Sequence, residues 1–503
     1  MTEKINERED RLKKLEELKK LNINPYPAKT EKNNTINKTL ADFEKLQKDS
    51  TELKIAGRLR SLRAHGNLTF SNIEDGSGKM QLAFSKKEIG ADSYKIFTKY
   101  IDIGDFIQIS GTAFLTHNGE KSIMVKDWKI LTKAIRPLPE KWHGLADEEE
   151  SLRKRYLDIL FNDEVKETFI KRAKFWQATR DFLIKHDFLE VETPVLENTT
   201  GGADAKPFET HHNALNMDVY LRISMGELWQ KRLMVAGFEK TFEIGRQFRN
   251  EGMDAEHLQD YTQMEFYWAY ADYEAGMKLV EELFKYTAQE TFGTLKFKIK
   301  NFEVDLGKKW ERYDYRETVK KYTHIDILDT DIKKIEAKLK ELKVEYDKKG
   351  FNKTRAIDNL WKYCRKQICG PGFLVGVPVE VSPLAKRDEA HPELSQRFQV
   401  IIAGSELGNG YSELNDPLDQ AERFKEQVKL REAGDEEAQM FDQEFVEALE
   451  YGMPPTCGFG FSERVFSYLM DKPGRECQIF PLMKPVIKTN KKIDVHELNK
   501  KLI

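Results

Sequence analysis

The stretch GSELGNGYSE at residues 404–413 places two glutamates, Glu406 and Glu413, seven positions apart among three glycines. The apolar run FQVII precedes it, so we expect a strand close to a core. Two carboxylates in such a place can hold a metal ion, act as acid and base, bind a cationic substrate or stay solvated at a sheet edge. Their odd spacing puts them on opposite faces of a strand, unless the glycines bend or bulge it.

An arginine lies between two strand-like arms in residues 242–273, which read FEIGRQFRNEGMDAEHLQDYTQMEFYWAYADY. Arg249 ends the first arm and leads into a polar loop. A guanidinium in this position can bind a phosphate through two parallel hydrogen bonds and stabilise charge that develops on it. In the second arm, Glu265 and Tyr267 are two positions apart and are expected to share one face of a strand.

Glycines and prolines mark two further stretches that suit a small ligand. Residues 186–208 read HDFLEVETPVLENTTGGADAKPF, where the paired glycines allow close backbone approach. Residues 452–470 read GMPPTCGFGFSERVFSYLM, so a glycine-rich strand is expected to turn into a helix near Ser462, with Arg464 in the first turn. A cation beside a helix N-terminus suits a triphosphate.

Five short β-like runs between residues 52 and 132, with a helical break near 86–100, predict a small closed barrel of the OB type. Such barrels bind single-stranded nucleic acid through aromatic and basic side chains on one face. Arg63 lies near the first strand and Phe70 on the second. The pattern leaves open whether Phe70 is on that face or is an ordinary core aromatic.

The rest of the chain mixes long helical patterns with strand-like runs. A lysine- and glutamate-rich segment within it, about 327–370, is expected to be an insertion of solvated helices without chemistry. The predicted domains are a helical extension at 1–50, the barrel at 51–135, a linker at 136–150, a large helix-and-strand domain at 151–485 and a basic tail at 486–503.

Composition limits the function classes. The 503 residues carry 82 Lys plus Arg against 85 Asp plus Glu, so the net charge of −3 shows no overall bias toward polyanions. The charged N-terminus MTEKINERED has no signal-peptide pattern, no run approaches 18 apolar residues, and the four cysteines lack zinc spacing. We therefore expect a soluble cytoplasmic protein without a membrane segment.

The stretches at 186–208, 242–273 and 452–470, in this order, resemble motifs 1, 2 and 3 of the class II aminoacyl-tRNA synthetases. The resemblance is to the subgroup with an N-terminal OB anticodon barrel, which contains the aspartyl, asparaginyl and lysyl enzymes. It runs from about residue 12 to about residue 485. It is closest to the lysyl enzymes in the stretches EVETPVL, FEIGRQFRNEG, MEFYWAYADY, PVEVSPLAK, GNGYSELNDP and IFPLMKP.

The resemblance implies an α+β fold, in which a five-stranded OB barrel precedes a catalytic domain built on an antiparallel sheet flanked by helices. It implies homodimers through motif 1, Mg²⁺ as cofactor, and a two-step reaction. ATP and L-lysine give lysyl-adenylate, and lysine then passes to tRNA(Lys). Residues 6–21 then form either a solvated amphipathic helix or a helix that contacts the tRNA backbone through Lys13, Lys14, Lys19 and Lys20.

The residues themselves also favour lysine as the substrate. A buried ammonium needs carboxylates and hydrogen-bond acceptors, whereas an acidic substrate needs a cation. No Arg or Lys occurs between residues 404 and 413. The candidate pocket instead supplies Glu227, Glu265, Tyr267, Asn409, Tyr411 and Glu413.

Motif position then implies a role for each residue. Arg249 and Arg464 are implied to be catalytic. ATP is expected against Arg249, Asn250, Glu251, His257, Leu258, Glu406, Leu407 and Arg464. Lysine is expected against Gly202, Glu227, Glu265, Tyr267, Asn409, Tyr411 and Glu413. Anticodon contacts are expected from Arg63, Phe70, Gln81 and Glu120, and Mg²⁺ contacts from Glu406.

The sequence departs from the family pattern near Glu406. Gln399 stands where the family usually has a second metal-binding carboxylate, so we expect a reduced or rearranged Mg²⁺ set. Leu258 replaces an asparagine that normally contacts ATP, and motif 3 is one residue shorter than usual. We expect Glu406 to face ATP and Mg²⁺ and Glu413 to face the lysine ammonium.

Two alternatives stay open at this point. One is a paralogue that lysylates a protein, although known relatives of that sort lack the barrel. The other is a non-catalytic tRNA-binding protein that has kept the fold, against which the intact Arg249, Glu251, Glu413 and Arg464 speak.

Overall fold

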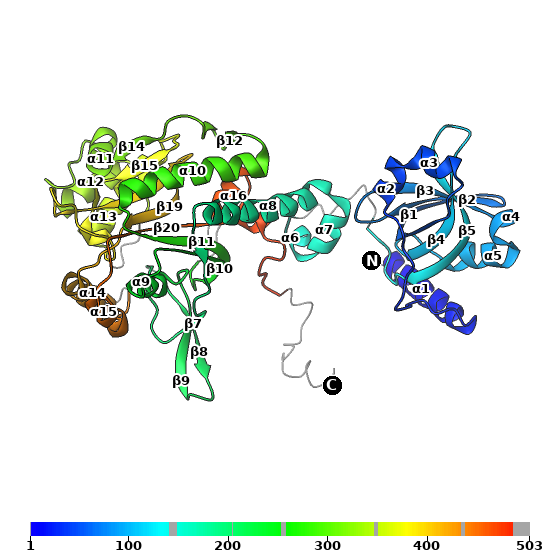
Figure 1. Cartoon of the computed structure of the whole chain (residues 1–503), viewed down its shortest axis with the longest axis horizontal. Coiled ribbons are helices and arrows are strands. Elements are labelled where there is room, and N and C mark those ends of the chain that lie inside the picture. The colour runs from blue at the N-terminus through cyan, green and yellow to red at the C-terminus, as the bar shows by residue number, and fades with distance from the viewer. Residues whose placement is uncertain are drawn as a thin grey trace. The chain divides into compact units, whose positions relative to one another are not determined.

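The computed structural model describes residues 2–139, 148–203, 205–252, 258–346, 351–433 and 438–485. The chain divides into two compact units, Met1–Gly144 and Leu145–Ile503, whose elements are labelled in Figure 1. Part of the predicted linker, His257 and the predicted basic tail lie outside the described residues.

A closed five-stranded barrel in the order β1-β2-β3-β5-β4 forms the centre of the first unit, which confirms the predicted OB barrel. Its strands are β1 (Leu53–His65), β2 (Leu68–Glu74), β3 (Lys79–Ser85), β4 (Phe106–Leu115) and β5 (Lys121–Thr132). Its helices are α1 (Thr2–Lys20), α2 (Ile36–Ala41), α3 (Phe43–Lys48), α4 (Lys86–Ile89) and α5 (Ala91–Tyr100). In β2, Thr69, Ser71 and Ile73 are buried, and the half-buried Phe70 alternates with them on the outer face.

Helix α1 packs its apolar side on the barrel and is not a freely solvated helix. Leu18 is fully buried in the barrel core, and Lys14 Nζ lies 2.5 Å from Asp102 Oδ1. The other lysines considered for backbone contacts pair within the helix: Lys13 with Asp10, Lys19 with Glu16 and Lys20 with Glu17. Exposed pairs of this kind contribute little to stability and are easily exchanged for other partners.

The second unit is built on an eight-stranded sheet in the order β14-β15-β18-β19-β20-β11-β10-β6. The inner pairs from β15 to β10 are antiparallel, as predicted, whereas the two edge pairs β14–β15 and β10–β6 are parallel. The strands are β6 (Leu189–Glu190), β10 (Lys240–Phe248), β11 (Asp260–Ala269), β14 (Glu311–Asp314), β15 (Gly372–Val375), β18 (Arg397–Ile402), β19 (Ser405–Ser412) and β20 (Thr456–Ser462).

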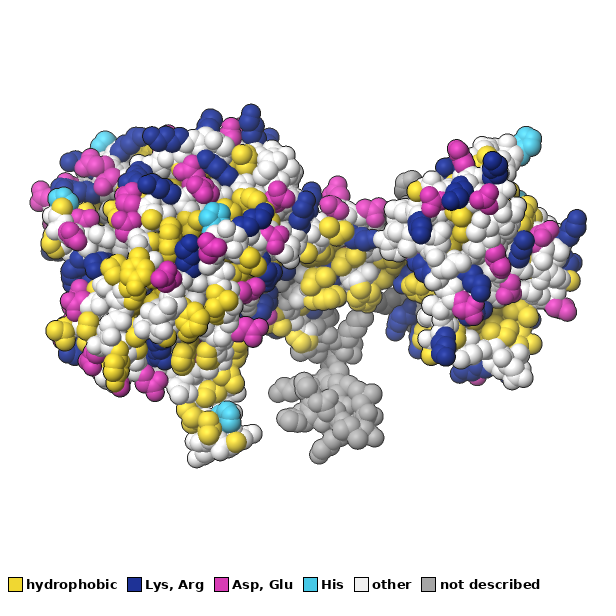
Figure 2. Space-filling view, viewed as in Figure 1, with side chains coloured by type: hydrophobic (Ala, Val, Ile, Leu, Met, Phe, Trp, Pro, Cys, Tyr) yellow, Lys and Arg dark blue, Asp and Glu magenta, His cyan; other side chains and the backbone are white. Residues whose placement is uncertain are grey.

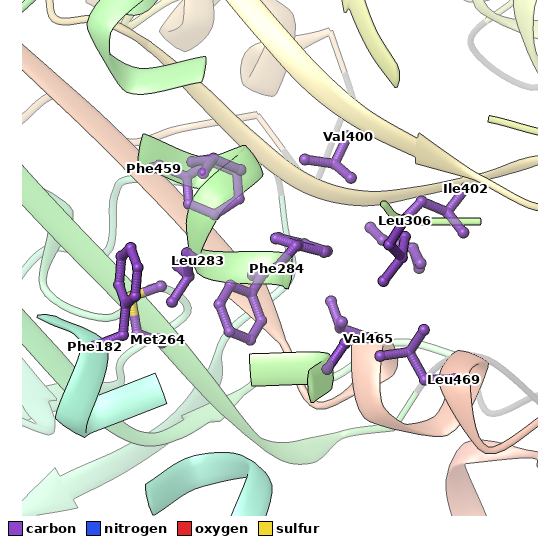
Figure 3. Close-up of a cluster of buried hydrophobic side chains, with 14 of the residues drawn as sticks. Phe182, Met264, Leu283, Phe284, Leu306, Val400, Ile402, Phe459, Val465 and Leu469 are labelled. Atoms are coloured by element: carbon purple, nitrogen blue, oxygen red, sulfur yellow. The ribbon is translucent and has the colours of Figure 1, made fainter. Parts of the chain in front are cut away.

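Two long helices, α8 (Asp163–Lys185) and α10 (Tyr273–Phe292), pack on one face of this sheet (Figure 1). Helix α10 begins at a side-chain cap, because Asp272 accepts a hydrogen bond from the backbone N of Ala275, and it ends at Gly293 in the left-handed conformation. Figure 3 shows Phe284 of α10 close to Phe459 of β20 in the core between them. Burying one such side chain contributes about 1.5–3 kcal/mol.

The predicted insertion forms helices with a core of their own. Ile335 and Leu339 of α12 (Ile332–Glu341) pack with Trp361 of α13 (Lys353–Arg365). This cluster also includes residues of α11 (Tyr315–Thr323) and of β15 and β18, so the insertion is continuous with the sheet.

Smaller elements complete the second unit. A three-stranded sheet in the order β7-β9-β8 projects away from the main sheet in Figure 1. These strands are β7 (Leu196–Glu197), β8 (Phe208–His212) and β9 (Met217–Leu221). The remaining strands are β12 (Lys296–Ile299), β13 (Phe302–Asp305), β16 (Val377–Pro378) and β17 (Leu394–Ser395). The remaining helices are α6 (Glu148–Arg153), α7 (Arg155–Phe161), α9 (Glu227–Val235), α14 (Pro417–Glu432), α15 (Gln443–Glu450), α16 (Arg464–Leu469), η2 (Val379–Val381) and η3 (Gly474–Cys477).

Two further observations concern the whole described chain. In that part of the molecule, no helix combines the length and apolar character needed to cross a membrane. All four cysteines are free thiols, and three of them are buried.

Candidate active site

A cavity of about 420 Å³ opens on the face of the main sheet opposite to α10. Most residues predicted to bind ATP or lysine line it. They are Gly202, Glu227, Arg249, Glu251, Leu258, Glu265, Tyr267, Glu406, Leu407, Asn409, Tyr411, Glu413 and Arg464. Asn250 is exposed outside this lining, and its backbone N donates to the carbonyl of Lys206 at 2.7 Å. The structure therefore brings together all but one of these predicted residues that it describes.

Two glycines of β20 form the floor of the cavity between its polar walls. The strand pairings across this floor are Glu265–Gly460–Asn409 and Tyr267–Gly458–Tyr411. A Cβ atom at Gly458 would overlap the carboxylate of Glu413, and one at Gly460 would overlap the side chain of Glu265. The absence of side chains at these two positions leaves room for a ligand over the sheet.

A β-bulge in β19 explains how Glu406 and Glu413 reach the same cavity. In the pairing of β18 with β19, Gln399 lies opposite Asn409 and Ile401 opposite Glu406. Two steps along β18 thus match three steps along β19, and the extra residue shifts the alternation of faces by one position. Both carboxylates line one cavity despite their odd spacing.

Glu265 is buried in the cavity wall, where its carboxylate accepts three hydrogen bonds. The donors are the backbone N of Met225 at 3.0 Å, Gln263 Nε2 at 2.6 Å and Tyr267 OH at 3.0 Å. Burial, and next the charge of Glu227, raises the pKa of Glu265 to about 7. Because the charged form is disfavoured, this carboxyl is poised to respond to an incoming cation.

A buried lysine that we did not predict lies between the other two glutamates. Lys231 Nζ is 2.8 Å from Glu227 Oε1 and 2.5 Å from Glu413 Oε2, and Tyr411 donates its hydroxyl to Glu227. Burial opposes the charged form of Lys231, but the two glutamates outweigh it and raise the pKa of Lys231. Burial raises the pKa of Glu413 well above its ordinary value, although Lys231 opposes that rise.

The two predicted phosphate-binding arginines are both anchored in the cavity wall. Arg249 follows β10 directly, and its Nε donates to the carbonyl of Ile223 at 3.3 Å. Arg464 is the first residue of α16, which begins two residues later than expected, and its Nη2 donates to Ser405 Oγ at 2.6 Å. Planar guanidiniums held in this way can meet a phosphate with little further loss of freedom.

Glu406 receives donors from the insertion as well as from β18. Trp361 Nε1 donates to Glu406 Oε1 at 2.5 Å, Gln399 Nε2 donates to Oε2 at 3.3 Å, and Arg365 Nη1 lies 3.8 Å from Oε1. The insertion is therefore not separate from the cavity, because its helix α13 contacts a predicted site residue. The sequence offered no signal for this contact, since it joins positions 45 residues apart.

The metal-binding capacity of this place is small. Among the residues that the structure describes, no group of three His, Cys, Asp or Glu side chains could hold a metal ion. Gln399 contacts Glu406 at this place, and its neutral amide is a poorer ligand for Mg²⁺ than a carboxylate. One carboxylate still fits Mg²⁺ where nucleotide phosphates supply the other ligands, since Mg²⁺ commonly binds through one or two carboxylates plus phosphates.

The residues predicted to read the anticodon lie close together on the barrel. Arg63 pairs with Phe70 across β1 and β2, and the next outward position of β2, Asn72, pairs with Gln81 of β3. Gln81 Nε2 donates to Glu120 Oε2 at 2.9 Å. The half-buried Phe70 alternates with the buried residues of β2, so its ring lies outside the barrel core.

Comparisons with known proteins agree with these two units. Residues 147–484 match the family model described as tRNA synthetases class II (D, K and N), and residues 53–131 match the one described as OB-fold nucleic acid binding domain. The chain is 44% identical to proteins named lysine--tRNA ligase from Thermosipho melanesiensis, Thermotoga maritima and Carboxydothermus hydrogenoformans. These alignments cover 94–95% of this chain and 96–97% of each relative.

Proposed function

The chain belongs to the class II tRNA synthetases (D, K and N), and we propose that the acid-lined cavity is the active site of a lysine--tRNA ligase. Such an enzyme joins L-lysine to ATP to give lysyl-adenylate and pyrophosphate, and then transfers lysine to the 3′ end of tRNA(Lys). The observation that carries this proposal is three buried glutamates in the same cavity as two anchored arginines. Carboxylates suit an ammonium substrate, and guanidiniums suit phosphates.

The first chemical step needs no general base from the protein. The lysine carboxylate, already an anion, attacks the α-phosphorus of ATP. A carboxyl oxygen–phosphorus bond forms while the bond to the bridging oxygen breaks, and pyrophosphate leaves. Arg249 binds the α-phosphate and the charge that develops on it, and Arg464 binds the γ-phosphate. Catalysis then consists mainly of orientation and charge stabilisation.

Different walls of the cavity bind the two ammonium groups of lysine and the nucleotide. Gly202, Glu227 and Glu265 hold the α-ammonium end of lysine, and Glu413 with Tyr267, Asn409 and Tyr411 holds the ε-ammonium. Glu251, Leu258 and Leu407 line the nucleotide part. In the second step the terminal hydroxyl oxygen of tRNA attacks the activated carbonyl carbon. The bond from this carbon to the phosphate oxygen breaks, and AMP leaves as its phosphate takes up the hydroxyl proton.

Mg²⁺ is the cofactor that the family implies, and Glu406 would hold it together with ATP phosphates. When bound, Mg²⁺ neutralises phosphate charge and helps to fix the shape of the triphosphate. The amide of Gln399 and the cation of Arg365 beside Glu406 support a smaller metal set than two carboxylates would hold.

A homodimer formed through motif 1 is supported by apolar side chains on that segment. Leu189, Val195 and Leu196 are about half exposed. Figure 2 shows further hydrophobic side chains over the projecting β7–β9 sheet. Sedimentation equilibrium tests this proposal, and a purely monomeric protein at micromolar concentration would refute it. We expect the enzyme to act in the cytoplasm, where tRNA(Lys) is charged.

Amino-acid-resolved pyrophosphate exchange tests the proposed function. Exchange that depends on ATP and lysine, with ornithine, aspartate and asparagine at least about 100-fold less effective, is the expected result. The acid-lined pocket repels the side chain of aspartate, asparagine lacks a side-chain ammonium, and ornithine is one methylene shorter than lysine, a difference worth about 10–200-fold. tRNA binding without any amino-acid-dependent exchange would instead favour a non-catalytic tRNA-binding protein.

Lysine binding is expected to weaken as the pH falls below about 7. With its pKa raised to about 7, Glu265 is largely protonated below that pH in the empty cavity, and a bound ammonium requires its carboxylate. Each displaced proton weakens binding about tenfold per pH unit below the pKa. The folding stability of the protein without lysine has the opposite pH dependence. The raised pKa of Glu265 stabilises the folded state at low pH, and this stabilisation is lost as the pH rises through 7.

Isothermal calorimetry of lysine binding between pH 5.5 and 8 checks this dependence. Glu265→Gln is the matched control, since it removes the titrating group and keeps a side chain of nearly the same size. Its profile is expected to be flatter than that of the unchanged protein. A lysine dissociation constant that stays constant between pH 8 and 6 would contradict the prediction.

Phe70→Ala is expected to raise the KM for tRNA about tenfold and to leave tRNA-free pyrophosphate exchange unchanged. Base stacking on one aromatic ring contributes about 1–3 kcal/mol. Phe70 belongs to the barrel unit, whereas the cavity residues belong to the second unit. Leu115→Ala, which removes an exposed apolar side chain from the same barrel, is the control. An equal effect of both substitutions on aminoacylation would argue against a stacking role.

A further inference from the structure

Lys231 is a fully buried lysine in the wall of the amino-acid pocket, and none of the roles described above uses it. Its ammonium contacts carboxylates from two different elements, Glu227 on its own helix α9 and Glu413 just after β19. The rings of Tyr411 and Phe445 have their centres 5.5 and 5.8 Å from Nζ. Aromatic faces and carboxylates together form a cage that keeps this cation in place.

This contact is not an ordinary helix-stabilising pair. An exposed Glu–Lys pair at i,i+4 contributes about 0.2–0.5 kcal/mol, and its side chains remain in water. The pair of Glu227 and Lys231 is buried, and the same ammonium also reaches Glu413, 182 residues further along the chain. Burying an ion cluster is a poor way to gain stability, because desolvation offsets most of the attraction. A role in the pocket explains the cluster better.

The buried charged side chains of the pocket include more carboxylates than cations. Three glutamates, Glu227, Glu265 and Glu413, are each at most 5% exposed in this pocket, and two of them, Glu227 and Glu413, contact the ammonium of Lys231. The phenols of Tyr267 and Tyr411 also face this cluster and are neutral at pH 7, since burial raises the pKa of each well above its ordinary value. With every carboxyl ionised, the cluster lacks two positive charges.

Arg397 is a further charged side chain of the cavity, and its partners lie outside the glutamate cluster. Arg397 lines the cavity, but its guanidinium donates to Asn409, Ser382 and the carbonyl of Val381. It therefore binds neutral groups and is not part of the carboxylate cluster. An amino acid that carries both an α-ammonium and a side-chain ammonium fills the deficit of two charges, with its own carboxylate left for Arg249.

We propose that Lys231 is the fixed internal cation of the amino-acid pocket, which positions Glu227 and Glu413 and limits the charge deficit to two ammonium groups. This inference rests on the proposed function and deepens it, because it states how the pocket selects a diamine amino acid. Lys231 is a positioning residue: it acts through the two glutamates, which contact the substrate.

Lys231→Met tests the proposal by removing the cation while keeping a long apolar side chain. In pyrophosphate exchange, the KM for lysine is expected to rise about 100-fold, because two buried carboxylates lose their common partner. The KM for ATP is expected to stay within about threefold. The pH below which lysine binding weakens is expected to rise by about one unit, because carboxylates without a cationic partner hold protons more tightly. Arg232→Met, the neighbouring cation on α9 that pairs with Asp442, is the control and should leave both KM values unchanged within about twofold.

The double variant Lys231→Met/Glu227→Gln gives the sharper test, because it removes one cation and one anion and restores the deficit of two. Its KM for lysine is expected to be at least about tenfold lower than that of Lys231→Met alone. A double variant as defective as the single one would overturn the proposal, and so would tighter lysine binding by Lys231→Met, which would mark Lys231 as a competitor of the substrate. Absence of lysine-dependent exchange in the unchanged protein would instead refute the proposed function itself.

Discussion

Arg249→Ala is expected to slow lysine-dependent pyrophosphate exchange by about 10³-fold, equivalent to about 4 kcal/mol of transition-state free energy. Arg249 lies at the point where β10 enters the motif 2 loop, and its Nε is tied to the carbonyl of Ile223. The guanidinium is therefore oriented before ATP binds, so its loss removes a preorganised cation from the phosphate that accumulates charge. Arg249→Lys is expected to recover only a small part of the rate, because an ammonium cannot form the same two parallel hydrogen bonds.

Arg246→Ala is the matched control for this prediction. Arg246 lies on β10, three residues before Arg249, and pairs with Asp260 at 2.6 Å in a partly exposed position. Exposed pairs of this kind contribute about 0.2–1 kcal/mol to folding, so exchange should change less than about threefold. Single-turnover measurement of adenylate formation separates chemistry from product release. An Arg249→Ala enzyme with a normal rate of adenylate formation would contradict the assigned role.

The architecture could be predicted because its signals are local or periodic. Alternating burial in strands such as β2, and the helical break between two barrel strands, are visible in a short window of sequence. The parallel pairings at the two edges of the main sheet were not predicted. They depend on how connections return to the sheet, and no short window contains that information.

The candidate site shows the same division between local and distant information. Glu265 and Tyr267 could be placed on one face from their spacing, and they do line one cavity. The sequence showed only that Glu406 and Glu413 would share a face if the strand bulged. Whether it does depends on its pairing with β18, and the bulge brings both carboxylates to one cavity. Lys231 was missed because its i,i+4 spacing from Glu227 looks like any surface helix pair until burial is known.

Glu413→Gln and Glu406→Gln are expected to damage different steps, although both carboxylates line one cavity. Glu413 contacts Lys231 and belongs to the buried cluster of glutamates, so its neutralisation should raise the KM for lysine about 100-fold and leave ATP binding nearly unchanged. Glu406 contacts Trp361, Gln399 and Arg365 instead. Its neutralisation should raise the KM for ATP about tenfold and increase the Mg²⁺ concentration needed for half-maximal exchange.

This division follows from what each carboxylate touches. Both substitutions keep the side-chain size and differ only in charge, so each is the control for the other. Initial rates of pyrophosphate exchange across matrices of lysine, ATP and Mg²⁺ concentrations separate the two effects. The same rise in both KM values for both variants would mean that the carboxylates act as one unit, and the assignment of separate lysine and nucleotide ends to the cavity would then be wrong. A Glu413→Gln defect confined to lysine, together with a Glu406→Gln defect confined to ATP and Mg²⁺, would show that β19 and the residue after it supply both ends of the cavity.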